Sequence, residues 1–227
     1  ELRHSLQHRN GNKKFYIPMI EPVEFTEDPL PVDPYLLGLL IGDGSIASGT
    51  PVISTGDREI LMSVASLVPS SLILSHEGRY DYRITAGKPV RHNPLIAALR
   101  LLGLWGKRSE AKFIPAAYKF SSAKTRLALL QGLLDTDGSS RSTNVEFSSA
   151  SKLLAEDVVF LVQSLGGIAA LDCRQPVFTY KGEKRKGQLS YRVTARFPVG
   201  IKPFRLSRKL ATYVERTKYA DIPRAIV

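Results

Sequence analysis

The sequence predicts an α+β fold built by tandem duplication, and three observations support this prediction. Two apolar stretches share one ending, LLGLLIGDG at 36–44 and LQGLLDTDG at 130–138. A second pair of stretches, DYRITA at 81–86 and SYRVTA at 190–195, agrees at four of six positions. The apolar periodicity predicts the order helix, strands, helix, strands, helix twice over, with the matching stretches in the same places.

The first copy begins at a clear helix signal. Asp33 is typical of an N-cap and Pro34 of a first helical position, so a helix is expected over 35–44. Alternation and turn residues then predict a strand at 51–55, a helix at 57–68, strands at 71–77 and 81–87, and a helix at 93–104.

The second copy repeats this order. The expected elements are a helix at 123–138, a strand at 145–150, a helix at 153–167, strands at 169–180 and 189–197, and a helix at 207–220. We therefore expect a lead-in at 1–32, a first half at 33–120 and a second half at 121–227.

The charge balance indicates a polyanionic partner. The chain of 227 residues carries 32 Lys and Arg against 21 Asp and Glu, a net charge of +11. Residues 174–209 alone hold eleven basic residues and one acidic residue. No run approaches the roughly twenty apolar residues of a membrane span, and the single Cys173 excludes an internal disulfide and favours a reducing intracellular compartment, cytoplasm or nucleoid.

Small residues recur at four-residue spacing on the two apolar helices. They are Gly38, Gly42, Gly132 and Thr136. Such a stripe lets another backbone approach closely, so we expect the two helices to pack side by side and to bring Asp43 and Asp137 together. Asp135 matches Ile41 in the other copy and is discounted.

Two carboxylates at helix C-termini predict a metal site. An anion there opposes the helix dipole, and two anions repel each other, so the arrangement is costly unless a cation is bound. Paired carboxylates suit Mg²⁺, which keeps water ligands and binds phosphate oxygens. The alternative is that both copies are ordinary acidic turns closing buried helices.

These motifs resemble the LAGLIDADG homing endonucleases, in particular the two-motif, intein-associated kind. KFIP at 112–115, TRLALLQGLLDTDG at 125–138 and PFRLSRK at 203–209 extend the likeness over nearly the whole chain. The resemblance implies two α-β-β-α-β-β-α halves related by a pseudo-twofold axis, with antiparallel sheets that form a DNA-binding saddle.

The same resemblance implies a site-specific double-strand DNA endonuclease that hydrolyses phosphodiester bonds with metal-activated water. Asp43 and Asp137 would bind Mg²⁺, with Gly42 and Thr136 as further metal positions. Mn²⁺ is expected to substitute, and Ca²⁺ to bind without supporting cleavage. Lys112 and Lys209 would lie near the scissile phosphates; the alternative is that they are plain surface lysines.

Other expectations concern the whole molecule. We expect a monomer with a long, partly palindromic DNA target, no membrane partner and no obligate protein partner. Position 1 is not Cys or Ser and no His-Asn pair ends the chain, so self-splicing is not expected and the chain resembles an endonuclease excised from an intein.

Strand alternation nominates the DNA contacts, which are expected on one polar sheet face and on the basic segment YKGEKRKGQ. The candidates are Arg79, Arg83, Thr85, Lys88, Glu146, Ser148, Arg174, Gln175, Lys181, Lys184, Arg185, Lys186, Arg192, Thr194 and Arg196.

Two other functional classes remain open. One is a catalytically inactive DNA-binding regulator or an RNA maturase of the same fold. The other is an aspartic protease, since LLDTDGSS resembles the Asp-Thr-Gly loop of those enzymes, although helical spacing disagrees with their all-β fold.

Overall fold

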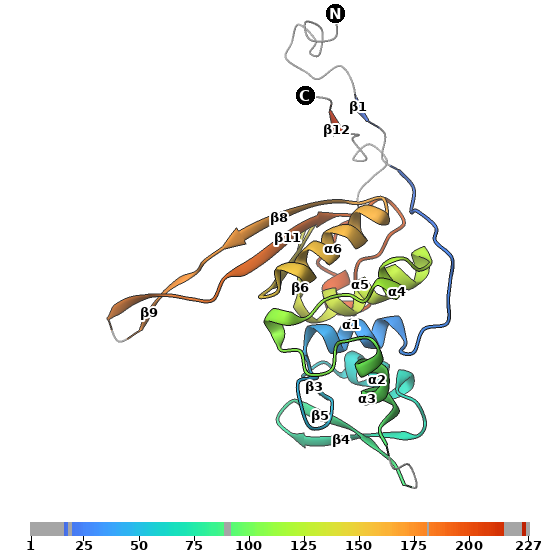
Figure 1. Cartoon of the computed structure of the whole chain (residues 1–227). Helices are drawn as coiled ribbons and strands as arrows, with labels where there is room; N and C mark the ends of the chain where they lie inside the picture. Colours follow the sequence, from blue (N-terminus) through green and yellow to red (C-terminus); the bar gives the residue numbers. More distant parts are fainter. Residues whose placement is uncertain (1–15, 18–19, 89–91, 181, 216–223, 226–227) are drawn as a thin grey trace, which may run out of the picture.

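Two repeats with the same order of elements make up the chain (Figure 1). The computed structural model describes residues 16–17, 20–88, 92–180, 182–215 and 224–225. The first repeat consists of α1 (Pro34–Gly42), β2 (Gly44–Ser45), β3 (Val52–Ser54), α2 (Arg58–Leu67), β4 (Leu72–Gly78), β5 (Asp81–Ala86) and α3 (Pro94–Leu101).

The second repeat follows the same α-β-β-α-β-β-α order. It consists of α5 (Ala123–Asp137), β6 (Gly138–Arg141), β7 (Asn144–Ser149), α6 (Lys152–Ser164), β8 (Ile168–Arg174), β11 (Ser190–Arg196) and α7 (Ser207–Leu210). A hairpin of β9 (Val177–Tyr180) and β10 (Glu183–Lys186) is inserted between β8 and β11. The predicted duplication is therefore confirmed.

Short elements connect the repeats and join the two ends of the described chain. The 3-10 helix η2 (Ser109–Ala111) and helix α4 (Ala116–Lys119) lie between the repeats. Strand β1 (Tyr16–Ile17) pairs antiparallel with β12 (Arg224–Ala225).

The two four-stranded sheets are antiparallel and have equivalent orders, β2-β3-β5-β4 and β6-β7-β11-β8. The matched stretches DYRITA and SYRVTA form β5 and β11, which are interior strands in equivalent positions. Ile84 and Val193 are fully buried beneath the helices, while their strand neighbours turn to the opposite face. Figure 1 shows the two sheets on either side of α1 and α5.

The expected start of α1 is confirmed. The Asp33 side chain accepts a hydrogen bond from the Leu36 amide at 3.0 Å, and Pro34 is the first helical residue. Ser122 caps α5 in the same way through the amide of Thr125. One buried apolar cluster includes both helices and extends into both repeats.

Two predicted elements differ from the structure. The helix expected over 207–220 ends at Leu210, because the Val214 amide instead donates to the Ser142 carbonyl at 3.0 Å and the backbone leaves the helical path. Residues 216–220 of this predicted helix lie outside the described residues. The strand expected over 169–180 is divided into β8 and β9 around Pro176, which has no amide hydrogen for a strand ladder. The residue pattern did not locate strands β2 and β6, which directly follow the two acidic helix ends, although the resemblance implies two strands after the first helix of each half.

Within the described residues, no helix combines the length and apolar character needed to cross a membrane.

Candidate functional site

The backbones of α1 and α5 touch at two glycines. A Cβ atom added to Gly38 would lie 2.2 Å from the Leu129 carbonyl oxygen, and one added to Gly132 would lie 2.4 Å from the Tyr35 carbonyl oxygen. Contacts of this kind are shorter than any side chain allows. The predicted close seam between the two helices is confirmed.

The seam ends at the two aspartates. A Cβ atom at Gly42 would lie 1.9 Å from Thr136 Oγ1 and 3.2 Å from Asp137 Oδ2, so the last turn of α1 lies directly against the end of α5. Asp43 is the C-cap of α1, and Asp137 is the last residue of α5. Both carboxylates remain open to solvent at this end of the seam.

The two carboxylates influence each other electrostatically. Burial, followed by the negative charge of Asp43, raises the pKa of Asp137 to about 6. Partial burial also raises the pKa of Asp43. The charges of Lys112 and Lys209 oppose both shifts, so two acids and two lysines form one coupled group.

Lys112 and Lys209 occupy equivalent positions beneath the helix ends. Lys112 Nζ donates to the carbonyl oxygens of Leu40, Ile41, Gly42 and Gly44 at 3.4, 2.8, 3.1 and 2.8 Å. Lys209 Nζ donates to those of Leu134, Asp135, Thr136 and Gly138 at 2.8, 2.7, 3.1 and 2.6 Å. Each ammonium group thus lies against carbonyl oxygens of the last helical turn and of the first residue of the following strand.

The burial of the two lysines excludes the alternative that they are plain surface residues. Lys112 is 5% exposed and Lys209 is 7% exposed, so neither is a surface lysine. Burial lowers the pKa of Lys112, and burial together with Arg208 lowers the pKa of Lys209 to about 8. The neighbouring Arg208 points away and pairs with Asp57 at 2.6 Å.

A cavity of about 580 Å³ opens beside Asp43. Its lining includes Ser54 from β3, Lys107 and Arg108 from the segment after α3, and Lys112. The cavity therefore connects one carboxylate and one lysine with the polar side of the first sheet.

Asp135 is a structural residue. It is 1% exposed and accepts hydrogen bonds from the Tyr35 hydroxyl at 2.7 Å and from the amides of Arg205 and Leu206. Discounting this residue as a metal ligand agrees with its burial. The aspartic protease prediction is wrong, because DTDG at 135–138 lies at the end of helix α5 in an α+β fold.

Most of the nominated DNA contacts lie on the sheet faces that the helices leave uncovered. Register places Arg83 and Thr85 on that face of the first sheet, and the same face of the second sheet carries Glu146, Ser148, Arg174, Arg192, Thr194 and Arg196. Arg79 lies in the β4–β5 turn, Lys88 follows β5, and Gln175 follows β8. Lys184, Arg185 and Lys186 form β10, while Lys181 lies outside the described residues.

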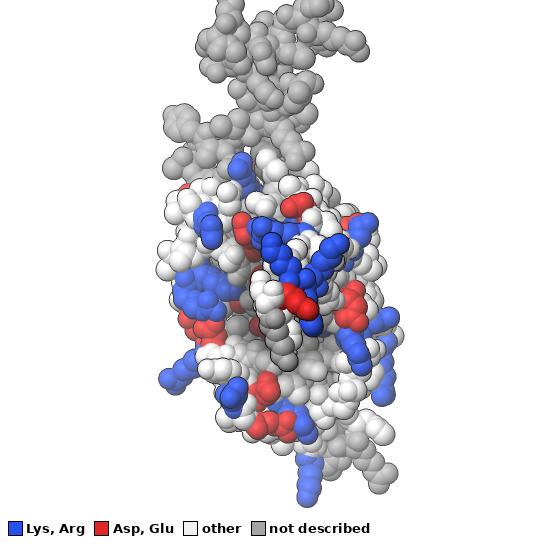
Figure 2. All heavy atoms as spheres, turned by 90° about the vertical axis from the view of Figure 1, so that its left-hand side faces the viewer, with Lys and Arg blue, Asp and Glu red and all other residues white. Residues whose placement is uncertain are grey.

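Several of these side chains already have partners on the same face. Arg83 pairs with Glu77 at 2.6 Å, Arg192 lies 3.9 Å from Glu146, and Arg196 donates to the Asn144 side chain. Figure 2 shows Lys and Arg around the projecting hairpin with acidic residues interspersed. The face is polar and mixed in charge, with an excess of basic groups at the hairpin.

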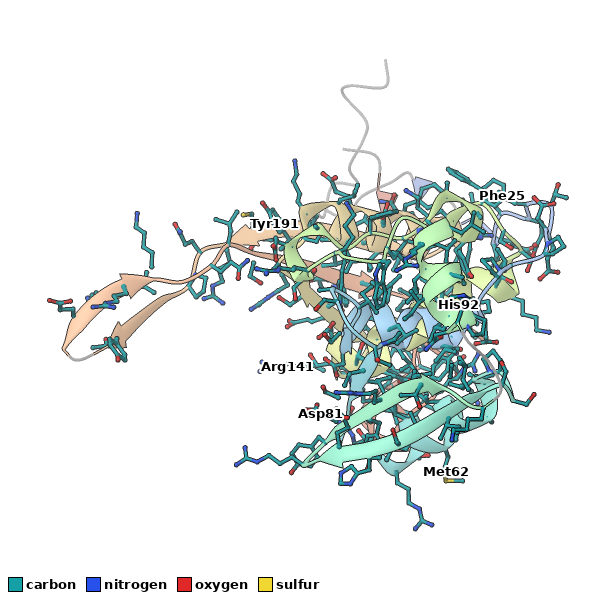
Figure 3. All side chains as sticks on the ribbon, turned by 60° about the horizontal axis from the view of Figure 1, so that its bottom comes forward. Phe25, Met62, Asp81, His92, Arg141 and Tyr191 are labelled. Carbon is teal, nitrogen blue, oxygen red and sulfur yellow. The ribbon has the colours of Figure 1, made fainter. Side chains whose placement is uncertain are left out.

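Sequence reasoning missed Arg141 of β6. Its register with Asn144 places it on the same face as Glu146 and Arg192. Figure 3 shows Arg141 between the sheet that carries Tyr191 and the sheet that carries Asp81 in that view. Recognising GSSR at 138–141 as a strand after the second helix would have identified this residue.

Comparisons with known proteins found a similar domain family and a similar longer protein. A family model described as a LAGLIDADG-like domain matches residues 124–193. The replicative DNA helicase DnaB of Mycobacterium intracellulare is 32% identical over 195 residues, which cover 86% of this chain and 28% of the helicase. The chain thus spans little more than a quarter of the helicase it matches.

Solved structures of I-DmoI were also found. One reports mesophilic variants of the homing endonuclease I-DmoI, with 16% identity, a TM-score of 0.44, and coverage of 73% of this chain and 88% of that one. Another reports I-DmoI in complex with DNA and Ca, with 16% identity, a TM-score of 0.44, and coverage of 73% and 82%.

The region matched by the family model lies within the second repeat. Residues 124–193 extend from α5 into β11. The first repeat carries the same order of elements and the same Asp-Gly ending of its first helix. The second repeat is thus similar to a LAGLIDADG-like domain, and the first repeat shares its order of elements.

Proposed function

We propose that this protein is a site-specific double-strand DNA endonuclease that requires a divalent metal ion, with Mg²⁺ as the physiological ion. One observation carries the proposal: two aspartates and two buried lysines meet at the end of a seam between two equivalent repeats. A duplex presents two backbones of opposite direction, and a pseudo-twofold site provides one acid and one lysine for each.

The oxygen donors suit a hard divalent cation. Asp43 and Asp137 are open to solvent on one side, yet partial burial raises the pKa of both carboxyls and the charge of Asp43 raises that of Asp137 further, so a cation would favour their ionised forms. The Gly42 and Thr136 carbonyl oxygens each accept one lysine hydrogen bond and keep a second lone pair. Among the described residues, no three His, Cys, Asp or Glu side chains cluster, so water and phosphate oxygens would complete the coordination.

The roles of the chain's own groups follow from this geometry. When bound, a divalent ion lowers the pKa of water and offsets negative charge on a phosphate. Asp43 and Asp137 would hold the ion against the helix ends. Lys112 and Lys209 fix the carbonyls behind each carboxylate and add positive charge where negative charge develops during phosphodiester hydrolysis.

The uncovered sheet faces and the basic hairpin would bind the duplex. Arg, Gln and Glu side chains there match the groups that read base edges, while Lys184 and Lys186 would contact phosphates. Two similar but unequal repeats in one chain predict a monomer and a long, partly palindromic target. A DNA substrate also places the protein in the DNA-containing compartment of the cell.

We further propose that the chain originates from an intein. The helicase match covers a minor part of a longer protein, as an inserted domain would. Strands β1 and β12 bring residues 16–17 and 224–225 together, which is the geometry that insertion into another chain needs. The domain boundaries that we favour remain 1–32, 33–120 and 121–227.

The test is cleavage of a complex linear DNA pool in Mg²⁺, with a parallel reaction in Ca²⁺, followed by sequencing of the new ends. The proposal predicts discrete ends within one long sequence in Mg²⁺ and binding without ends in Ca²⁺. Mn²⁺ should support the same ends. Specific retention of DNA or RNA with no new ends in any of these ions would instead indicate a binding protein or a maturase.

A further inference from the structure

The segment that carries Lys112 is held by the opposite repeat. Ser151, the N-cap of α6, donates its hydroxyl to the Lys112 carbonyl at 2.7 Å. Asp157 in α6 accepts the Ile114 amide at 2.8 Å and pairs with Lys119 at 2.6 Å. Helix α6 belongs to the second repeat, whereas Lys112 caps α1 of the first.

The segment that carries Lys209 crosses in the other direction. Arg208 donates to Asp57 through Nε at 2.9 Å and Nη2 at 2.6 Å. The Ser207 amide and hydroxyl donate to Glu59 at 3.1 and 2.9 Å. Asp57 and Glu59 lie at the start of α2 in the first repeat, whereas Lys209 caps α5 of the second.

From this reciprocal crossing we infer that the second helix of each repeat positions the lysine of the other repeat. Asp157 would be a positioning residue for the Asp43–Lys112 site, and Asp57 for the Asp137–Lys209 site. The inference rests on the proposed nuclease function and deepens it. It predicts that a substitution at the positioning residue of one repeat slows cutting at the site of the other repeat.

The contacts made by Asp157 and those made by Asp57 differ in strength. Asp157 is 4% exposed and has both an amide and an ammonium partner, so its removal leaves two donors without their acceptor. The Arg208–Asp57 pair is more open, with Arg208 60% exposed at the side chain. The effect of losing Asp157 should therefore exceed the effect of losing Asp57.

Strand-resolved nicking tests the inference. Lys112→Met and Lys209→Met first define which strand depends on which lysine, using the DNA obtained from the pool. Asp157→Ala should then slow the Lys112-dependent strand relative to the other by about two- to thirtyfold. The matched variant Asp57→Ala should slow the Lys209-dependent strand relative to the other strand. Equal slowing of both strands by each variant, or the same bias from both, would overturn the inference.

A second pair of variants distinguishes a positioning effect from a folding defect. Lys119→Met and Arg208→Met each remove only the charged partner, from side chains that are 23% and 60% exposed. Lys119→Met should slow the Lys112-dependent strand, and Arg208→Met should slow the Lys209-dependent strand. Both variants should keep melting temperatures near that of the wild type. Unchanged strand ratios in both would count against the inference.

Amide hydrogen exchange separates this inference from the nuclease proposal, because it needs no DNA. Asp157→Ala should speed exchange of the Asp43 amide, which donates to Leu39 in the last turn of α1, more than exchange at the end of α5. Asp57→Ala should do the reverse. If the wild type cut no DNA but exchange followed this crossed pattern, the nuclease proposal alone would fail; an uncrossed pattern would refute the positioning role.

Discussion

At the scale of single residues, the site combines groups that are unfavourable together without a ligand. Asp43 and Asp137 end their helices where the dipole is negative, and each raises the cost of ionising the other. Lys112 and Lys209 offset part of that cost, since each donates to four carbonyl oxygens at a helix end. A bound cation would offset the rest.

The pKa of Asp137 predicts a pH effect in metal-free protein. Its folded pKa of about 6 lies above the ordinary aspartate value of 3.8, so between these values the folded state binds more protons than the unfolded state. This group's destabilising effect is therefore fully present above about pH 6 and is relieved as the pH falls toward about 4.

Melting curves in EDTA measure this effect. Asp137→Asn removes the titrating group, so the melting temperature of the variant minus that of the wild type should be larger at about pH 7 than at about pH 4.5. A difference that stays constant across this range would contradict the raised pKa.

The sequence revealed the two aspartates but not the surroundings of the two lysines. Asp43 and Asp137 occur in a repeated motif, and repetition is visible in the residues themselves. The burial of Lys112 depends on contacts with residues about seventy positions away, which no local pattern encodes. Arg208 and Lys209 are adjacent in sequence, and only the fold turns one inward and the other outward.

At the scale of elements, the seam between α1 and α5 sets the distance between the two carboxylates. Gly38 and Gly132 allow the backbones to meet. Any side chain at these positions would separate the helices, and it would therefore move Asp43 relative to Asp137.

Gly38→Leu or Gly132→Leu should destabilise the fold. The added atoms would meet backbone carbonyl oxygens, and overpacking of this kind costs about 1–3 kcal/mol or more. Thermal unfolding should show a melting temperature lower by about 2–4 °C for each kcal/mol lost. Ala65→Leu, on the exposed face of α2, is the matched control and should change it little. An unchanged melting temperature in either glycine variant would refute the close seam.

Elements were predictable where a repeat or a cap marked them. Both motif helices, α2, α6, β5 and β11 lie where periodicity placed them. Helix α7 was predicted too long because its sequence contains no stop signal; a tertiary hydrogen bond to Ser142 ends the helical path instead. Strands β2 and β6 are too short and polar to show an alternating pattern.

The β9–β10 hairpin makes the two repeats unequal. Arg79 and Tyr80 alone connect β4 to β5, whereas the hairpin stands between β8 and β11. Lys184 and Lys186 lie on one face of β10, about 6.6 Å apart along the strand. We expect this face to contact the DNA backbone outside the region covered by the sheets, on one half of the target only.

Lys184→Ala together with Lys186→Ala should weaken binding without moving the cut. Each lost phosphate contact should make the slope of log affinity against log salt shallower by about 0.9. Lys124→Ala with Lys152→Ala removes two exposed lysines from helix starts and is the matched control. The hairpin assignment would be wrong if both double variants changed the slope equally.

At the scale of the whole molecule, the proposed function gives a reason for the duplication, because one chain would supply one site to each strand of a duplex. Each repeat supplies one sheet face, one aspartate and one lysine, and the helix seam joins them. The crossing contacts through Asp157 and Asp57 join the repeats a second time. The molecule is therefore organised so that neither site is built by one repeat alone.

The most direct measurement of this account is strand cleavage by wild type, Asp43→Asn and Asp137→Asn on the DNA selected from the pool, with affinity measured on the same DNA in Ca²⁺. We predict that either substitution abolishes double-strand cutting while affinity stays nearly intact, because the carboxylates hold the metal rather than the duplex. Full double-strand cutting by either variant would contradict the assignment of the paired aspartates as the cleavage site.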